Sequence, residues 1–500
     1  LIKYELTNKT TGEKTVGINP YKMGVAGSMT VGTTINFELR MWIINSATND
    51  DLYIKENGSY KEDSNGLILT KNFCSKVKIT GTDDPYLTPL DISGANKPVL
   101  ASNMIPVYYD ETNSVWKKAN VSNKDISNPW YSYNSSGDYK GMWANAVTVK
   151  DTNRATYLNA EPGTTIPMDD INTMWVWIPR FNAVTPSNYN GGTKTKPNAI
   201  DVTFVKQNET AIDAFTFGNK ELSGFWYAKF ETSHSTLASS TTANNLGCTN
   251  ETCSNANGII IKPNVKSLRY NNVSNFFFVS RSMEQSGNSF GFVNTEVDIH
   301  MNKNNEWGAV AYLTQSIYGR CTSSTSCTEI GINNNSGYLT GYGAPAGSSS
   351  SVTNGTYNTT LGKDASTTGT IYGIYDMSGG TYEYVMGVLA DTNGNPRSGY
   401  NSSNNSGFTG MLYDGTTYTG IAFPDSKYYN LYTGTTYTGH ALTETKNWYS
   451  DVAYFVGSDG PWFARGGGYN IDTGAGVFSF GSSSGNSVFS SSSRLVISNE

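Results

Sequence analysis

Apolar side chains occupy every second position between Ile35 and Ile43. This period of two predicts a β-strand with one buried face. Runs at 67–69 and 73–79 predict further strands, separated by turn residues such as Asn57-Gly58. We therefore expect a small β-domain over residues 1–96, by default an immunoglobulin-like sandwich, that serves attachment or assembly.

After residue 96 the chain is rich first in Pro, Asn and Ser, and then in Trp and Tyr. We interpret residues 97–164 as a linker with short hairpins that pack on the next domain. Continuous apolar runs at 174–180 and 225–231 each predict a buried strand. Residues 330–500 predict short strands among Gly, Ser, Thr and Asn loops.

The best helix candidate spans residues 304–319. Asn304 can cap its start, Glu306 lies in the first turn, and Gly319 can end it. The side chains that share one face of this helix are Trp307, Val310, Ala311, Thr314 and Ile317. The fold prediction is α+β and β-rich with few helices: a sandwich-like N-terminal domain, then a large domain over residues 165–500.

Charged residues make up only 15% of the chain, which contains 33 Tyr and 51 Gly. This composition is typical of a β-rich extracellular, cell-surface or virion-surface protein. The net charge of −6 argues against a nucleic-acid partner. The sequence has no run of about twenty apolar residues, so we expect no membrane insertion. Because the chain opens at Leu1 without a hydrophobic leader, we expect that a targeting or anchoring segment was removed or lies outside it.

Four of the five cysteines form two close pairs, Cys248 with Cys253 and Cys321 with Cys327. This spacing, in Thr-, Ser- and Asn-rich segments, predicts two small disulfide-closed loops in an oxidising compartment. Zinc is the alternative, but zinc sites favour C-x-x-C spacing and further ligands. Cys74 is left over; we predict an inert cysteine, with a semi-exposed thiol or an intermolecular bridge as alternatives.

Other candidate chemistry is sparse. His234, His300 and His440 lie far apart without metal-ligand spacing, so we interpret them as surface or core residues. Asp391 opens the sequence Asp-Thr-Asn-Gly-Asn, which resembles half a calcium loop. Because Pro396 follows and a bidentate Glu is missing, we prefer a turn. No cofactor is predicted, with calcium near Asp391 as the alternative.

The stretch from Trp462 to Ile497 differs from the rest because small, polar and aromatic residues fill it with hardly a charge between Arg465 and Arg494. Tyr offers rigid contact area, and Ser, Gly and Asn offer adaptable hydrogen bonds, as in an antibody-like paratope. One interpretation is a binding surface on a scaffold. The other is a Ser-rich loop between edge strands.

Three sequence blocks occur in order: NEWGAVAYL at 305–313, GIYDMSGGTYEYVMG at 373–387, and FARGGGYN…SSRLVI at 463–497. Together they resemble the formylglycine-generating-enzyme, or sulfatase-modifying, branch of the C-type-lectin fold. The resemblance covers roughly residues 165–500 and implies that fold for the second domain. The departures from the family pattern fall at Gly380, Tyr382, Tyr384 and Ser493.

The enzymes of that family depend on cysteine thiolates near the closing block, and no cysteine follows Cys327. We therefore predict that the chain is not an enzyme. It also resembles the variable proteins of diversity-generating retroelements, which place mutable residues on this fold near the carboxy terminus.

In such proteins, mutagenesis at template adenines can change an Asn codon of type AAC to Ser, Gly, Asp, Tyr, Phe, Ile, Val or Thr. By this resemblance the predicted ligand-binding residues are Tyr469, Asn470, Ile471, Asp472, Ser479, Ser482, Ser483, Ser484, Asn486, Val488, Phe489, Ser490, Ser491 and Ser492. The predicted invariant frame is Arg465, Gly466, Gly467, Ala475, Gly476, Val477, Phe478, Arg494, Leu495 and Val496.

We therefore predict a secreted or surface-displayed recognition or adhesion protein that binds a protein or glycan ligand on another cell. Tyr469, Phe489 and Phe480 would be its aromatic anchors. The low charge predicts weak electrostatic steering and little salt dependence of affinity. The alternative is a pilin or filament subunit, a homo-oligomer in which the strand at 1–6 pairs with a neighbour, and which can also display the binding domain. A phage tail receptor-binding protein is the third hypothesis.

Overall fold

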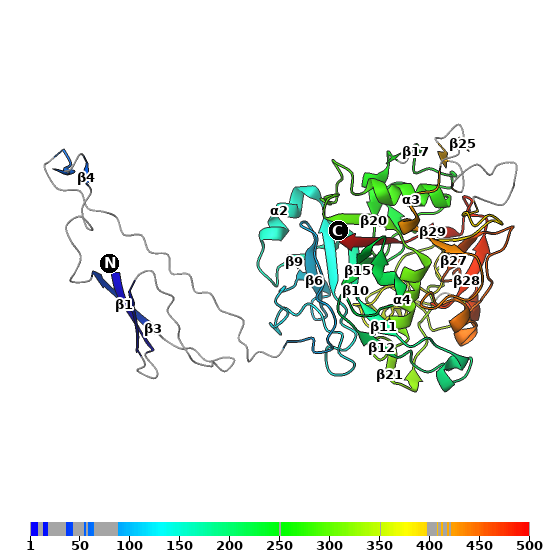
Figure 1. The fold of residues 1–500 in the computed structure, drawn as a ribbon, viewed down its shortest axis with the longest axis horizontal. Coiled ribbons are helices and arrows are strands. Elements are labelled where there is room, and N and C mark those ends of the chain that lie inside the picture. Colours follow the sequence, from blue (N-terminus) through cyan, green and yellow to red (C-terminus); the bar gives the residue numbers. More distant parts are fainter. Residues whose placement is uncertain are drawn as a thin grey trace. The chain divides into compact units, whose positions relative to one another are not determined.

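The computed structural model describes residues 2–8, 14–18, 37–43, 55–56, 59–64, 89–249, 252–350, 352–397, 408, 412–413, 418–419 and 422–499. The chain divides into two compact units, Leu1–Thr88 and Pro89–Glu500 (Figure 1). The domain boundary predicted after residue 96 therefore lies inside the second unit.

The first unit contains a three-stranded antiparallel sheet in the order β2-β1-β3. Its strands are β1 (Ile2–Asn8), β2 (Lys14–Ile18) and β3 (Phe37–Ile43), and β4 (Lys55–Glu56) pairs with β5 (Ser59–Tyr60). The strand predicted at 35–43 is confirmed as β3. The runs at 67–69 and 73–79, with Cys74, lie outside the described residues, and the immunoglobulin-like sandwich stays a prediction.

An eight-stranded sheet runs through the second unit in the order β20-β30-β15-β10-β8-β6-β7-β9 (Figure 1). Its strands are β6 (Ile105–Asp110), β7 (Val115–Lys118), β8 (Asn145–Val149), β9 (Thr165–Ile166), β10 (Ile171–Pro179), β15 (Gly224–Ala228), β20 (Val297–Met301) and β30 (Leu495–Asn499). The stretch interpreted as a linker, 97–164, contributes β6, β7 and β8. The C-terminal strand β30 lies between β15 and β20, so the chain end is part of the central sheet.

A second sheet carries the candidate site, in the order β26-β23-β27-β28, with β29 paired in parallel to β23. Its strands are β23 (Tyr382–Leu389), β26 (Asn430–Tyr432), β27 (Trp462–Arg465), β28 (Phe480–Ser483) and β29 (Ser491–Ser493). The segments 469–479 and 484–490 therefore connect strands of one sheet.

Two-stranded ribbons make up the remaining described strands: β11 (Phe181–Ala183) with β12 (Val202–Phe204), β13 (Thr216–Phe217) with β14 (Lys220–Glu221), β16 (Ser233–His234) with β19 (Ile259–Ile260), β17 (Cys248–Thr249) with β18 (Thr252–Cys253), β21 (Cys321–Ser323) with β22 (Ser326–Cys327), and β24 (Leu412–Tyr413) with β25 (Tyr418–Thr419). Both predicted disulfides, Cys248–Cys253 and Cys321–Cys327, are confirmed. Each joins the two strands of a short hairpin.

The α-helices are α2 (Asp151–Asn159), α3 (Val273–Ser282), α4 (Asn304–Thr314) and α5 (Thr360–Asp364). Short 3₁₀ turns are η1 (Met168–Asp170), η2 (Asn188–Gly191), η3 (Asp213–Phe215), η4 (Ala256–Gly258), η6 (Ser426–Tyr428), η7 (Thr443–Thr445), η8 (Trp448–Ser450) and η9 (Asp472–Gly474). The prediction of a β-rich protein with few helices is confirmed for the described residues.

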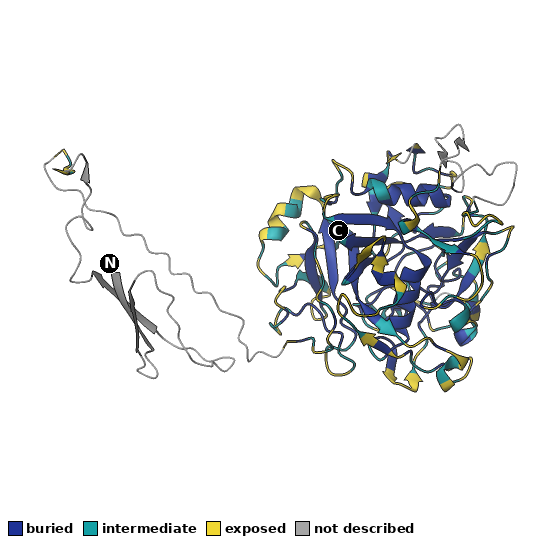
Figure 2. Cartoon of the chain, viewed as in Figure 1, coloured by how far each residue is buried: buried dark blue, intermediate teal, exposed yellow. Residues whose placement is uncertain are grey.

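The predicted helix at 304–319 exists as α4 but differs at both ends. Its N-cap is Lys303, whose backbone N–H donates to the Glu306 carboxylate at 2.7 Å. It ends at Thr314, before Gly319. Every residue of α4 is buried, so the helix lies inside the unit and buries its other faces as well as the apolar one (Figure 2).

One aromatic-rich hydrophobic core fills the second unit (Figure 2). The runs predicted at 174–180 and 225–231 are confirmed as β10 and β15, and Trp175, Trp177 and Trp226 on them are fully buried. Within the described part of the chain, we find no helix with the length and hydrophobicity needed to span a membrane.

Candidate functional site

Two buried arginines hold the C-terminal stretch in place, and the first is Arg494. Its Nη2 and Nε atoms donate to the Glu383 carboxylate on β23, at 2.5 and 2.9 Å, and both side chains are fully buried. It also donates to the carbonyl oxygens of Ala228 and Tyr375, each at 2.9 Å. Burial alone would lower the pKa of the guanidinium, but Glu383 outweighs it and holds that pKa above its usual value. Arg494 therefore joins the two sheets as a permanent cation.

The second buried arginine is Arg465, at the end of β27. Its guanidinium donates to the Ala441 carbonyl at 2.9 Å and to Asn304 Oδ1 at 3.2 Å, and it lies 5.4 Å from the centre of the Trp307 ring. The Trp307 indole in turn donates to the Val477 carbonyl at 2.8 Å. Helix α4 thus holds both ends of the segment 466–477.

The backbone turns sharply directly after Arg465. Gly466 and Gly467 have φ values of 80° and 75°, which glycine adopts without strain. A Cβ on Gly467 would also lie 2.8 Å from Ala475 Cα. All ten predicted frame residues are buried: Arg465, Gly466, Gly467, Ala475, Gly476, Val477, Phe478, Arg494, Leu495 and Val496. Between the frame positions, residues 469–473, 481–484 and 486–490 are exposed or half-buried.

Most of the predicted ligand-binding residues are exposed or half-buried. They are Tyr469, Asn470, Ile471, Asp472, Ser482, Ser483, Ser484, Asn486, Val488, Phe489 and Ser490. Three are buried and correct the prediction: Ser479, Ser491 and Ser492 are 3%, 4% and 0% exposed. The latter two lie on β29 beside β23, and such small side chains fit between packed elements. Phe480, named as a third anchor, is 1% exposed and packs on Phe463.

Four of the exposed residues line an open hollow of about 440 Å³. The residues of this serine hollow are Asp459, Gly460, Ser482, Ser483, Ser484 and Asn486. The buried Tyr384 lies beneath it: its hydroxyl donates to the Asn486 carbonyl at 2.7 Å and meets Ser483 Oγ at 3.1 Å. Burial raises the pKa of Tyr384, so this phenol stays protonated and keeps its hydrogen bond.

Two others, Tyr469 and Phe489, lie near Arg269, which the sequence analysis did not single out. The Arg269 guanidinium lies 4.0 Å from the centre of the Tyr338 ring, and its Nη1 donates to the Phe489 carbonyl at 2.8 Å. The Tyr469 ring meets Tyr338 edge-on at 5.1 Å. Phe489 is 57% exposed. We name Arg269, Tyr338, Tyr469 and Phe489 the Arg269 cluster.

Two further exposed side chains lie beside the start of β28. Val452 and Tyr454 are 44% and 70% exposed and lie on a segment hydrogen-bonded to Phe480 at the start of β28. Ile471 is close to Val452, because a Cβ on Gly474 would lie 2.8 Å from both side chains.

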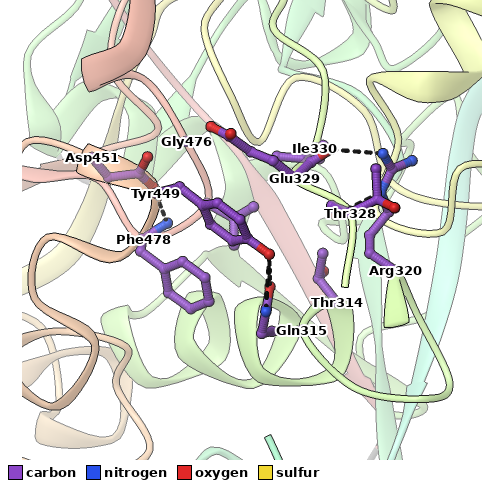
Figure 3. A pocket seen from close by; sticks show the side chains of 11 residues that line it. Thr314, Gln315, Arg320, Thr328, Glu329, Ile330, Tyr449, Asp451, Gly476 and Phe478 are labelled. Atoms are coloured by element: carbon purple, nitrogen blue, oxygen red, sulfur yellow. Dashed lines mark hydrogen bonds between the residues drawn. The ribbon is translucent and has the colours of Figure 1, made fainter. Parts of the chain in front are cut away.

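A cavity of about 10 Å³, the size of one water, lies beneath the segment 476–478 (Figure 3). Asp451 and Glu329 are among its lining residues, and Asp451 Oδ2 accepts the Phe478 N–H at 3.0 Å. Burial raises the pKa of Asp451 well above its ordinary value and that of Glu329 to about 7. Asp451 therefore supports the segment by accepting a backbone hydrogen bond.

The histidines have structural partners. His300 is buried between Asp298 and Glu306, at 3.2 and 3.0 Å. His440 bridges the Tyr432 hydroxyl and Asp213, at 2.6 and 2.8 Å.

His234 Nε2 contacts the Asn255 carbonyl oxygen at 2.9 Å. Among the described residues, no three His, Cys, Asp or Glu side chains group as metal ligands do.

At the suggested calcium loop, Asp391 Oδ1 accepts the N–H groups of Asn393 and Asn395, at 2.8 and 2.9 Å. These hydrogen bonds close the turn that we preferred for this stretch.

No known family model matches this chain, and no curated protein matches its sequence. The resemblance to the C-type-lectin fold and to retroelement variable proteins therefore stays a prediction from the three sequence blocks.

Proposed function

We propose that this protein is a surface-displayed or secreted recognition protein that binds a glycan or protein ligand through the serine hollow and the Arg269 cluster. The observation that carries the proposal concerns the segment 484–490, which contributes residues to both places.

The fold holds this segment by its backbone carbonyl groups. The carbonyls of Gly485, Asn486, Val488, Phe489 and Ser490 accept hydrogen bonds from five donors elsewhere in the unit. The donors are Val273 N (3.0 Å), Tyr384 Oη (2.7 Å), Tyr270 N (3.1 Å), Arg269 Nη1 (2.8 Å) and Tyr382 N (2.9 Å), in that order. A loop held by its main chain keeps its shape when exposed side chains such as Ser484, Asn486 or Phe489 are exchanged. That is the property a display loop needs.

The chemistry of the two places also fits recognition. The hollow has the volume of a small-ligand site, and serine hydroxyls, an amide and a carboxylate line it. Beside it, the exposed Phe489 ring and the half-buried Tyr469 ring offer apolar contact area with few rotatable bonds.

A pair of matched variants tests the proposal. Ser482→Tyr fills the hollow from an exposed position on β28, whereas Ser323→Tyr places the same bulk on an exposed position of β21. Both variants and the unchanged protein are applied to one array of immobilised glycans and proteins. We expect spots bound by the unchanged protein to be lost with Ser482→Tyr and kept with Ser323→Tyr. Equal binding by all three proteins would refute the proposed site.

As a second proposal, the N-terminal unit assembles the protein into filaments. Because β1 is paired on both sides in the described sheet, the strand at 1–6, which we expected to pair with a neighbour, has no free edge there; a neighbour's strand would instead add to the outer strands β2 or β3. Negative-stain images that show only discrete particles at high protein concentration would contradict this proposal.

A further inference from the structure

Arg269 differs from most described arginines of the second unit because no described carboxylate neutralises it. Five other arginines of the unit form an ion pair with an Asp or Glu side chain: Arg154, Arg180, Arg281, Arg320 and Arg494. Arg269 instead contacts an aromatic ring and a backbone carbonyl. A half-buried cation without a counter-ion in the described structure, placed between two predicted contact residues, is suited to an anionic group of a ligand.

The guanidinium is also held in position before any ligand arrives. Its central carbon lies 4.0 Å from the centre of the Tyr338 ring and 5.5 Å from that of Tyr270, and its Nη1 atom donates to the Phe489 carbonyl, so contacts on several sides restrain it. Tyr469 supports Tyr338 from the side at 5.1 Å. The Nε atom of Arg269 is buried, so a ligand would meet the Nη atoms. A fixed planar fork of this kind matches the geometry of a carboxylate.

The segment 484–490 connects this cation to the serine hollow. Asn486 lines the hollow, and three residues later the Phe489 carbonyl accepts the Arg269 hydrogen bond. A ligand that extends along the segment would therefore meet the cation at one end. At the other end it would meet a dense set of hydroxyl, amide and carboxylate groups. Sugars carry hydroxyl groups that both donate and accept hydrogen bonds, which is what such a lining satisfies.

We infer that the ligand is a saccharide with carboxylate-bearing sugars, whose carboxylate pairs with Arg269 while neighbouring hydroxyl groups bind in the serine hollow. This inference rests on the proposed function, because it assigns a ligand class to the same surface. A single cation selects sugars with isolated carboxylates, and Asp459 in the hollow accepts from sugar hydroxyls.

The test measures binding by biolayer interferometry to oligogalacturonate and to sialyllactose. The neutral counterparts are carboxyl-reduced oligogalacturonate and lactose. The variants are Arg269→Gln, Arg269→Lys and the matched control Arg397→Gln, which removes a charge from another partly exposed arginine of the unit. We expect at least one acidic probe to bind, and Arg269→Gln to weaken that binding about tenfold or more. The affinity of Arg269→Lys for the acidic probe should lie between those of the unchanged protein and Arg269→Gln, because lysine keeps the charge without the planar fork. Arg397→Gln should change nothing.

The neutral counterparts keep the test independent of how well the variants fold. The unchanged protein should bind a neutral probe about as weakly as Arg269→Gln binds the acidic one. Equal binding of acidic and neutral probes overturns the carboxylate inference but leaves the proposed function, provided that Ser482→Tyr abolishes binding. Binding of poly-glutamate in preference to both acidic sugars overturns the assignment to saccharides. Absence of binding to both acidic sugars also overturns the inference. The proposed function fails by a different result, namely equal binding of Ser482→Tyr and Ser323→Tyr to the array.

Discussion

The ion pair between Arg494 and Glu383 offers the sharpest test of how the chain end is held. Substitution Glu383→Gln keeps the size of the side chain and one carbonyl oxygen but removes the negative charge. Both partners are fully buried, with contacts of 2.5 and 2.9 Å. The variant therefore leaves a buried cation without its counter-ion, which costs about 3–5 kcal/mol in proteins.

The surroundings of Arg494 place the expected loss near the lower end of that range. Two carbonyl groups, of Ala228 and Tyr375, still accept from it, and the buried Asp376 still interacts with its charge. We expect Glu383→Gln to lower the free energy of unfolding by about 3 kcal/mol. That is a large part of the roughly 5–15 kcal/mol by which folded proteins are stable.

Urea unfolding followed by tryptophan fluorescence measures this loss, because Trp226 and Trp307 are fully buried in the same core. The double variant Glu383→Gln with Arg494→Met should be less destabilised than the sum of the two single variants. Its second substitution removes the charge that the first leaves unpaired. A loss below about 1 kcal/mol for Glu383→Gln would refute the assignment of Arg494 as a buried cation that depends on Glu383.

Three further predictions follow from individual groups. The pKa of Glu329 is raised to about 7, so the stability it contributes is present below its ordinary value of 4.5 and lost as the pH rises through 7. The urea concentration at the unfolding midpoint should accordingly decrease as the pH rises from 5 to 8, and the decrease should be smaller in Glu329→Gln. A midpoint that increases over this pH range would contradict the assignment. Replacing either disulfide pair by serines should cost about 2 kcal/mol, because each closes a loop of only a few residues. The melting temperature of each variant is measured by calorimetry. An unchanged melting temperature in both variants would argue against both bonds. Phe489→Ala should reduce ligand binding but shift the unfolding free energy by no more than about 0.5 kcal/mol, since the ring is 57% exposed; a larger loss of stability would mean that the ring supports the fold.

Local features of the fold were predictable from the sequence where one short segment decides them. The cysteine pairs are few residues apart, so hairpin closure was the simple solution. The apolar runs that became β10 and β15 could only be buried. By contrast, residues 97–164 resemble a linker in composition, yet β6, β7 and β8 pair within the large sheet. The composition of a proline-rich segment does not indicate which distant strand it will pair with in such a sheet.

The candidate site shows the same division. The frame positions were inferred from the sequence blocks, and each of them is buried. Ser491 and Ser492 could not be told from exposed serines, because their burial depends on parallel pairing with a strand more than a hundred residues earlier. Arg269 and Tyr338 lie even further from Tyr469 and Phe489 in the chain, and only the packed fold brings them together.

The loop 484–490 is stabilised through its main chain. Main-chain carbonyls of 485–490 receive the stabilising hydrogen bonds, and the donors, such as Tyr384 and Arg269, stand outside the loop. The stability of the loop should therefore depend on the donors and on the buried frame more than on the exposed side chains. If the exposed side chains instead stabilised the loop, exchanging Ser484 or Asn486 would cost as much stability as Tyr384→Phe. We expect Tyr384→Phe alone to be costly, because it leaves the Asn486 carbonyl without that donor.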